Sequence, residues 1–105
     1  MEKIPRVIHY CWFGKNKKQK LINKCIDTWK KYLKDYEIIE WNEENFNIDM
    51  SNFTKEAYED KNWAFVSDYC RIWVLYNYGG VYLDTDIEVL KPIDDLYREK
   101  EKKGF

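Results

Sequence analysis

Two aspartates separated by one residue, Asp84 and Asp86, have the types and spacing that could hold a metal ion. They follow Gly79-Gly80 and a short apolar run that is typical of a buried strand. In an extended chain both carboxylates would share one face, about 7 Å apart at a rise of roughly 3.3 Å per residue. One carboxylate could bind Mg²⁺ or Mn²⁺ directly and the other through water, leaving positions open for diphosphate oxygens. The spacing alone is unspecific, so the prediction depends on its place after a strand, where ligands collect in α/β sheets.

A second polar pair, Asp68 and Arg71, lies three residues apart in a segment with helical character. Residues at this spacing share one helical face. The pair is either an intrahelical ion pair, worth a few tenths of a kcal/mol, or two polar groups directed into a cleft. Spacing alone leaves both interpretations open.

Two aromatic residues of the first apolar segment have alternative roles. Trp12, just before Gly14, is either a core aromatic or a flat surface on which a base stacks, worth about 1–3 kcal/mol. His9 is the only histidine and lies inside the same apolar run, which favours a packed, hydrogen-bonded residue over a ligand or base. The sequence contains no P-loop, Gly-x-Gly-x-x-Gly or serine-elbow motif.

The elements that must position these residues begin with a strand–helix–strand unit. Residues 6–13 and 36–41 are short, β-rich runs, and residues 17–34 between them carry an apolar stripe of helical period. Such a unit predicts a largely parallel sheet. The stripe consists of Ile22, Cys25, Ile26, Trp29 and Leu33.

The second half of the chain predicts a further helix and strand. Residues 42–61 are polar and irregular, with a short helix near 55–60, and a longer helix spans 62–78 and ends at Gly79. Its apolar stripe is formed by Phe65, Tyr69, Ile72 and Tyr76. We expect a strand at 81–84, a short extended piece at 87–90, a turn at Lys91-Pro92 and a charged helix or fraying end after it.

Length and composition limit the classes of protein. The 105 residues form one domain, residues 1–105, and 45% hydrophobic content supplies a core. No apolar run is long enough to span a membrane, and the N-terminus lacks a signal-peptide pattern. The three cysteines are widely spaced and predict reduced thiols in a cytoplasmic protein.

Charge is divided unevenly along the chain. Residues 1–34 hold ten Lys/Arg against two Asp/Glu, whereas residues 35–105 hold eight against seventeen. The basic third is either a solvated lysine face or a weak contact with the inner face of an anionic membrane. No nucleic-acid partner is expected.

Taken together, "IPRVIHYCWFG" and "AFVSDYCRIWVLYNYGGVYLDTDIEVLKP" resemble the DXD-containing sugar-nucleotide glycosyltransferases of the GT-A fold. The nearest in pattern are bacterial capsular-polysaccharide transferases and fungal initiating mannosyltransferases, and more distantly the glucosylating bacterial toxins. The resemblance covers residues 4–14 and 62–93 and implies a Rossmann-like, donor-binding half of a GT-A domain.

The resemblance also implies residue roles. Trp12 would stack on the base, Tyr82 would line the nucleotide pocket, and Asp68 and Arg71 would hold hydroxyls of the donor sugar. Asp84 would contact ribose and sugar hydroxyls and meet the metal through water. Asp86 would bind manganese or magnesium directly. The donor would be a UDP-sugar or GDP-mannose, and its sugar would pass with retention to a saccharide or other glycan acceptor in polysaccharide biosynthesis.

Two alternatives remain at this stage. Catalytic domains of the resembling families are about twice as long, so the chain could be a truncated, non-catalytic fragment that only binds the sugar nucleotide. The run "VYLDTDIEV" also resembles the motif of haloacid-dehalogenase-like phosphatases, although Glu88 stands where those enzymes carry Thr or Val and the motif comes late in the chain.

Overall fold

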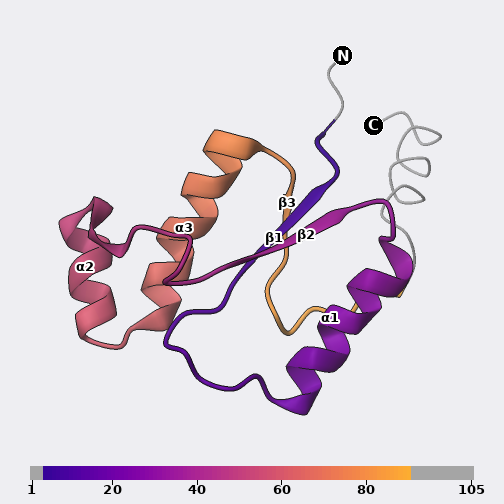
Figure 1. Cartoon of the computed structure of the whole chain (residues 1–105), viewed down its shortest axis with the longest axis horizontal. Helices are drawn as coiled ribbons and strands as arrows, with labels where there is room; N and C mark the ends of the chain where they lie inside the picture. The colour runs from indigo at the N-terminus through magenta and orange to yellow at the C-terminus, as the bar shows by residue number, and fades with distance from the viewer. Residues whose placement is uncertain (1–3, 91–105) are drawn as a thin grey trace, which may run out of the picture.

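The computed structural model describes residues 4–90 and confirms an α/β fold (Figure 1). The strands and helices follow in the order β1 (Val7–Cys11), α1 (Lys20–Tyr32), β2 (Glu37–Trp41), η1 (Ile48–Met50), α2 (Asn52–Glu59), α3 (Trp63–Tyr78) and β3 (Val81–Tyr82). The helix predicted near 55–60 therefore begins earlier, because Ser51 caps it by accepting a hydrogen bond from the Thr54 N–H. The turn and charged tail predicted from Lys91 onward lie outside the described residues.

The three strands form a parallel sheet in the order β2-β1-β3. β1 pairs along its full length with β2, from Val7 opposite Glu37 to Cys11 opposite Trp41. β3 is shorter, and only Ile8 and His9 of β1 have partners in it. The predicted parallel sheet is confirmed, and β1 is its central strand among the residues described.

Helices cover both faces of the sheet, with α1 on one side and α3 with α2 on the other (Figure 1). The α1 stripe buries Ile26, Trp29 and Leu33 against Ile8 and Tyr10 of β1. Alternate residues of β1 point to the opposite face, where Cys11 packs in the core on the α3 side. This explains why β1 carries no charged residue: both of its faces are buried.

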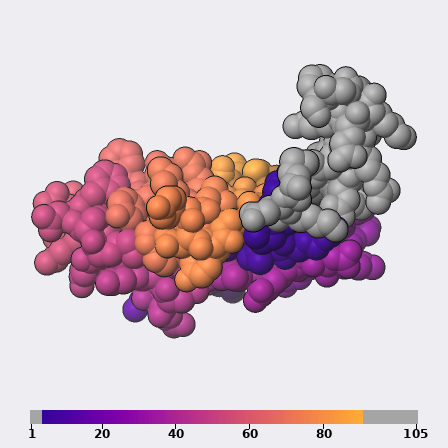
Figure 2. Space-filling model, turned by 90° about the horizontal axis from the view of Figure 1, so that it is seen from above, coloured from indigo at the N-terminus to yellow at the C-terminus, as the bar shows by residue number. Residues whose placement is uncertain are grey.

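The apolar stripe predicted for α3 is wrong, because it is not the face that the helix buries. The residues that α3 buries are Val66, Cys70 and Val74, whereas Ile72 and Tyr76 are 66% and 88% exposed. The surface view shows α3 open to solvent beside α2 (Figure 2). The helix is apolar around most of its circumference, so its sequence contains two candidate stripes and does not itself select one.

His9 joins β1 to the end of α3 and is fully buried. Its Nδ1 accepts a hydrogen bond from Trp41 Nε1 at 3.0 Å and therefore carries no proton. The ring proton is on Nε2, which donates to the Gly79 carbonyl at 2.8 Å. The prediction of a structural histidine is confirmed. Gly80 follows with φ +93°, and a Cβ there would lie 2.6 Å from the Val7 carbonyl oxygen, so the approach of β3 to β1 requires glycine.

None of the helices within residues 4–90 is long and apolar enough to cross a lipid bilayer.

Candidate functional site

A cleft of about 460 Å³ opens at the carboxyl ends of the strands. The chain leaves β1 toward α1 on one face of the sheet and reaches β3 through α2 and α3 on the other. The loops after the neighbouring strands β1 and β3 thus lie at the carboxyl edge of the sheet, which is where parallel α/β sheets bind ligands. The cleft is lined from the loop after β1, the start of α3 and the loop after β3, by Cys11, Trp12, Phe13, Asn16, Lys17, Gln19, Ile22, Trp63, Ala64, Ser67 and Thr85.

The two aspartates lie in a turn, which corrects the prediction of an extended strand. β3 ends at Tyr82, and the Ile87 N–H donates to the Asp84 carbonyl at 3.1 Å, closing a turn that contains Asp86. The common face and spacing of about 7 Å therefore do not apply, since they require a strand. The segment at 87–90, expected as extended, forms no strand within the described chain.

This acidic turn (84–87) is held at both ends. Before it, the Leu83 N–H donates to the His9 carbonyl at 3.0 Å. After it, Trp29 Nε1 donates to the Ile87 carbonyl at 2.8 Å and the Val89 N–H donates to Thr28 Oγ1 at 2.9 Å. Trp29 is fully buried in the core, so the turn is fixed to α1 on one side and to β1 on the other.

The donor set of the turn fits a hard divalent cation. Asp84 and Asp86 are both exposed, while Thr85 between them lines the cleft. No cluster of three His, Cys, Asp or Glu within residues 4–90 could form a cage for a metal ion. Mg²⁺ and similar cations usually bind through one or two carboxylates together with water and substrate phosphates, which is the set that this turn can supply.

Trp12 lies at the edge of the cleft, and its side chain is partly buried. Its backbone N–H continues the β1–β2 pairing by donating to the Trp41 carbonyl at 2.8 Å, and its ring packs against the core on the α1 side. Its indole N–H donates to the Asn16 carbonyl at 2.7 Å. Part of the ring thus packs on the core, as one interpretation expects, while the ring also lines the cleft and base stacking stays a prediction.

Asp68 and Arg71 lie on the exposed side of α3. Their closest atoms, Arg71 Nη2 and Asp68 Oδ1, are 4.0 Å apart, and the side chains are 44% and 60% exposed respectively. The Arg71 guanidinium also lies over the Tyr82 ring, 5.9 Å from its centroid. The structure therefore brings Arg71 to the end of β3, two residues before the acidic turn, although neither member of the pair lines the cleft itself.

Tyr82 is half-buried and packs against the core on the α3 side, beside Cys11. Burial, followed by the neighbouring Cys11, raises the pKa of Tyr82, so its hydroxyl stays protonated. Contacts from Cys70, Tyr82 and Ser67 lower the pKa of Cys11 even though burial opposes this. Tyr82 thus belongs to the core on the α3 side and, unlike Trp12, does not line the cleft.

Several residues at the site were not singled out from the sequence. Gly14 has φ +97°, and a Cβ there would lie 2.7 Å from the Trp63 ring, so glycine lets the loop after β1 close on the start of α3. Ser67 and Thr85 line the cleft beside Asp68 and between the two aspartates. Their neighbours in sequence were the only signal that could have identified them.

A family model described as "Glycosyltransferase sugar-binding region containing DXD motif" matches residues 19–103. The chain is 36% identical over 106 residues to inositol phosphoceramide mannosyltransferase 1 of Schizosaccharomyces pombe, a match that covers 91% of this chain and 32% of that protein. It is 30% identical over 107 residues to inositol phosphoceramide mannosyltransferase 3 of the same yeast, covering 89% and 27%.

A shorter match, 38% identical over 40 residues, links the chain to human alpha-1,4-N-acetylglucosaminyltransferase and covers 37% of this chain and 12% of that protein. The chain thus spans at most about a third of the length of these relatives. No solved structure gives a significant match.

Proposed function

The chain belongs to the family of glycosyltransferase sugar-binding regions that contain a DXD motif, and from this premise we propose that it binds a nucleotide-diphospho-sugar with a divalent cation and takes part in transfer of that sugar to an acceptor. One observation carries the proposal: the turn with Asp84 and Asp86 is anchored at the carboxyl end of β3, and its Thr85 lines the same cleft as Trp12. An acidic turn and an aromatic ring at one cleft suit the two ends of a nucleoside diphosphate.

The cation is Mn²⁺ or Mg²⁺, held directly by Asp86 and through water by Asp84. When bound, it neutralises charge on the diphosphate that departs from the sugar. Asp84 also accepts hydrogen bonds from ribose and sugar hydroxyls. Trp12 supplies a ring face to the base, and such stacking contributes about 1–3 kcal/mol per base.

Recognition of the sugar is proposed for Asp68 and Arg71. Both side chains are largely exposed and their mutual ion pair is long, so ligand hydroxyls can replace it at little cost. Arg71 lies over Tyr82, which is two residues before the acidic turn. This position, next to the place proposed for the diphosphate, supports a role toward the sugar beyond it.

The donor is proposed to be GDP-mannose or a UDP-sugar, and the acceptor a saccharide or another glycan-bearing molecule, with retention of configuration. The names of two relatives specify mannosyl transfer to inositol phosphoceramide, and that of a third specifies N-acetylglucosaminyl transfer. A phosphatase function has no support from the family match.

A weak contact with an anionic membrane surface is proposed for the exposed side of α1. This helix carries exposed lysines and also Leu21, which is 65% exposed. Basic side chains near an apolar one favour an anionic lipid surface. The lysines are Lys20, Lys24, Lys30 and Lys31.

Calorimetric titration of the 105-residue chain with UDP and GDP tests the central part of this proposal. One of the two nucleotides should bind much more tightly with Mn²⁺ than with a chelator, and Asp86→Asn should remove that difference because it removes the charge of the direct ligand. Asp60→Asn, which changes an exposed aspartate at the end of α2, is the matched control and should behave as wild type. Equal affinity with and without metal would contradict the proposal.

A further inference from the structure

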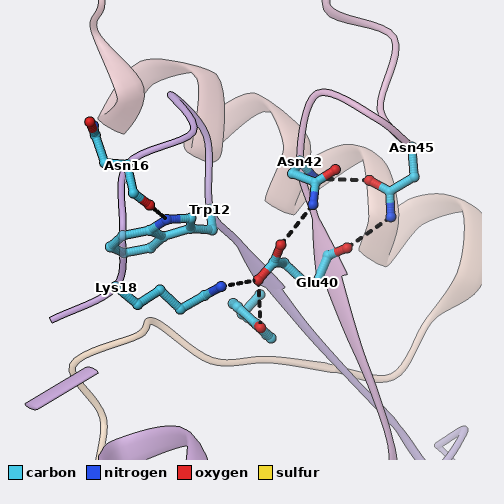
Figure 3. A network of polar contacts seen from close by, with 7 residues as sticks. Trp12, Asn16, Lys18, Glu40, Asn42 and Asn45 are labelled. Carbon is cyan, nitrogen blue, oxygen red and sulfur yellow. Dashed lines mark hydrogen bonds and ion pairs between the residues drawn. The ribbon is translucent and has the colours of Figure 1, made fainter. Parts of the chain in front are cut away.

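The loop after β1 is held to the end of β2 by a buttress of polar contacts that no sequence pattern indicates. Lys18 of the loop forms an ion pair with Glu40 at 2.5 Å, and the side chains of both are only about a quarter exposed (25% and 28%). Glu40 also accepts hydrogen bonds from Tyr10 Oη at 2.8 Å and Asn42 Nδ2 at 2.7 Å. Every one of these partners approaches the same carboxylate (Figure 3).

Lys18 connects this carboxylate to Trp12. Its ammonium lies over the indole ring, 5.6 Å from the ring centroid, and a cation in this position is attracted to the aromatic face. Trp12 lines the cleft whereas Lys18 does not, although Asn16, Lys17 and Gln19 on either side of it do. The indole thus contacts the Lys18 ammonium while it also forms part of the cleft wall.

The edge of the indole is fixed separately. Trp12 Nε1 donates to the Asn16 carbonyl at 2.7 Å (Figure 3), and this loop also includes Lys15 at φ +61°, a conformation that costs energy for a residue other than glycine. Ion pair, cation over the ring and edge hydrogen bond together leave the indole little freedom to rotate.

We propose that Glu40 is a positioning residue for the nucleotide: it holds Lys18 against Trp12 and so presents one face of the indole to the base. The inference rests on the proposed function, since it assigns the open face of Trp12 to a nucleobase. It adds two residues, Glu40 and Lys18, that do not touch the ligand themselves. Burial raises the pKa of Glu40, but the contacts from Lys18, Asn42 and Tyr10 lower it overall, so the carboxylate remains charged at neutral pH.

Nucleotide titrations with Mn²⁺ test the effect on binding. Glu40→Gln keeps the shape of the side chain but removes its charge, and we expect it to weaken nucleotide binding by at least about threefold, a part of the roughly 5–150-fold that complete loss of stacking represents. Lys18→Met should weaken nucleotide binding by a similar factor, whereas Lys18→Arg should keep most of the wild-type affinity. Glu44→Gln, the same change on an exposed side chain in the adjacent turn, should leave the affinity unchanged.

A double-mutant cycle separates positioning from a general loss of structure. In a Trp12→Ala background, Glu40→Gln should change the nucleotide dissociation constant by less than about twofold, because the group on which it acts is absent. An equal loss in both backgrounds would overturn the proposal. If Glu40→Gln does not fold, Lys18→Met and Lys18→Arg carry the same test, with circular dichroism as the check on folding.

A ligand-free measurement keeps this inference distinct from the proposed function. The Trp12 indole N–H can be assigned in an ¹⁵N-correlation spectrum by its loss in Trp12→Phe. Glu40→Gln should shift or broaden this resonance more than those of the other four tryptophans, and Glu44→Gln should not. An unchanged Trp12 resonance would overturn the positioning role. If Glu40→Gln shows the Trp12 shift but the wild-type chain binds no nucleotide, the result would instead contradict the proposed function.

Discussion

Replacement of Arg71 by lysine separates recognition of the sugar from the stability of the fold. Lysine keeps the positive charge but loses the planar fork that can bridge two oxygens. In the free protein Arg71 makes a 4.0 Å contact with Asp68, with both side chains largely exposed, and lies 5.9 Å from the centroid of the Tyr82 ring. Arg71→Lys therefore tests whether the fork itself has a function.

The structure limits the effect on stability. An exposed ion pair contributes about 0.2–1 kcal/mol and an exposed cation over a ring about 0.5–1 kcal/mol, and lysine retains part of each. The free energy of unfolding, measured by urea denaturation, should therefore fall by less than about 1 kcal/mol. Hydrogen bonds from a charged group to ligand hydroxyls are worth about 1.5–3 kcal/mol, so affinity for the sugar nucleotide should fall roughly 10–150-fold.

The assay is a pair of titrations with Mn²⁺ present, one with the nucleoside diphosphate and one with the corresponding sugar nucleotide. The nucleoside diphosphate should bind Arg71→Lys as it binds wild type, because Arg71 is proposed to contact only the sugar. Arg6→Lys is a matched control: Arg6 lies 3.9 Å from Asp35 and 5.5 Å from the Tyr36 ring centroid, just before β1 and thus at the opposite end of the sheet. It should alter neither affinity.

Two results would refute the reasoning about Arg71. Parallel weakening of both ligands would indicate a phosphate contact or a structural role. Unchanged affinity for both, with a small loss of stability, would reduce the pair to the intrahelical ion pair that the spacing also allows.

The remaining predictions concern the base, pH, transfer and membranes. Trp12→Ala should fold and weaken nucleotide binding by about 1–3 kcal/mol in calorimetry; an unfolded variant would favour a purely core role. Because the folded pKa of Glu40 is below its ordinary value of 4.5, its stabilising effect is present above that value and is lost as pH falls through the folded pKa. Wild type should therefore lose its urea-midpoint advantage over Glu40→Gln on acidification, and an advantage that persists in acid would contradict this. The 105-residue chain should bind donor but transfer no sugar to saccharide acceptors in a radiolabel assay, because it spans at most about a third of its relatives; robust transfer would show this to be wrong. Vesicles with anionic lipid should retain the chain in low salt and release it in high salt, and equal retention by neutral vesicles would exclude the proposed role of the α1 lysines.

The strand–helix–strand unit could be predicted from sequence because its patterns are unambiguous. In α1 the apolar positions such as Cys25, Ile26 and Trp29 recur with helical period among charged ones, and they are the residues that α1 buries. The apolar run of β1 has no polar face, which indicates a strand covered on both sides.

The face of α3 and the shape of the acidic segment could not be predicted in this way. Val66 and Ile72 are similarly apolar, so only the presence of the sheet and α2 decides which is buried. The acidic segment reads as a continuation of β3, yet the bonds of Ile87 to Asp84 and Trp29 turn it back onto α1. The Trp29–Ile87 contact joins residues far apart in sequence, and local propensity contains no information about it.

The buttress around Glu40 was missed for the same reason. In sequence Glu40 is one of two glutamates in a β-rich run, and a charged residue there is typical of a solvated strand position. Its partners Lys18 and Tyr10 come from the loop after β1 and from β1 itself, and they meet it only after β1 and β2 pair. The resemblance to a family named the residues proposed to touch the ligand, but not those that position them.

The most direct measurement is an anomalous difference map from crystals of the chain grown with Mn²⁺ and the nucleoside diphosphate that binds it. We expect a manganese peak at the side chain of Asp86, with the diphosphate beside it and the base against the cleft-side face of Trp12. A manganese peak away from the acidic turn, or a nucleotide bound with its base remote from Trp12, would contradict it.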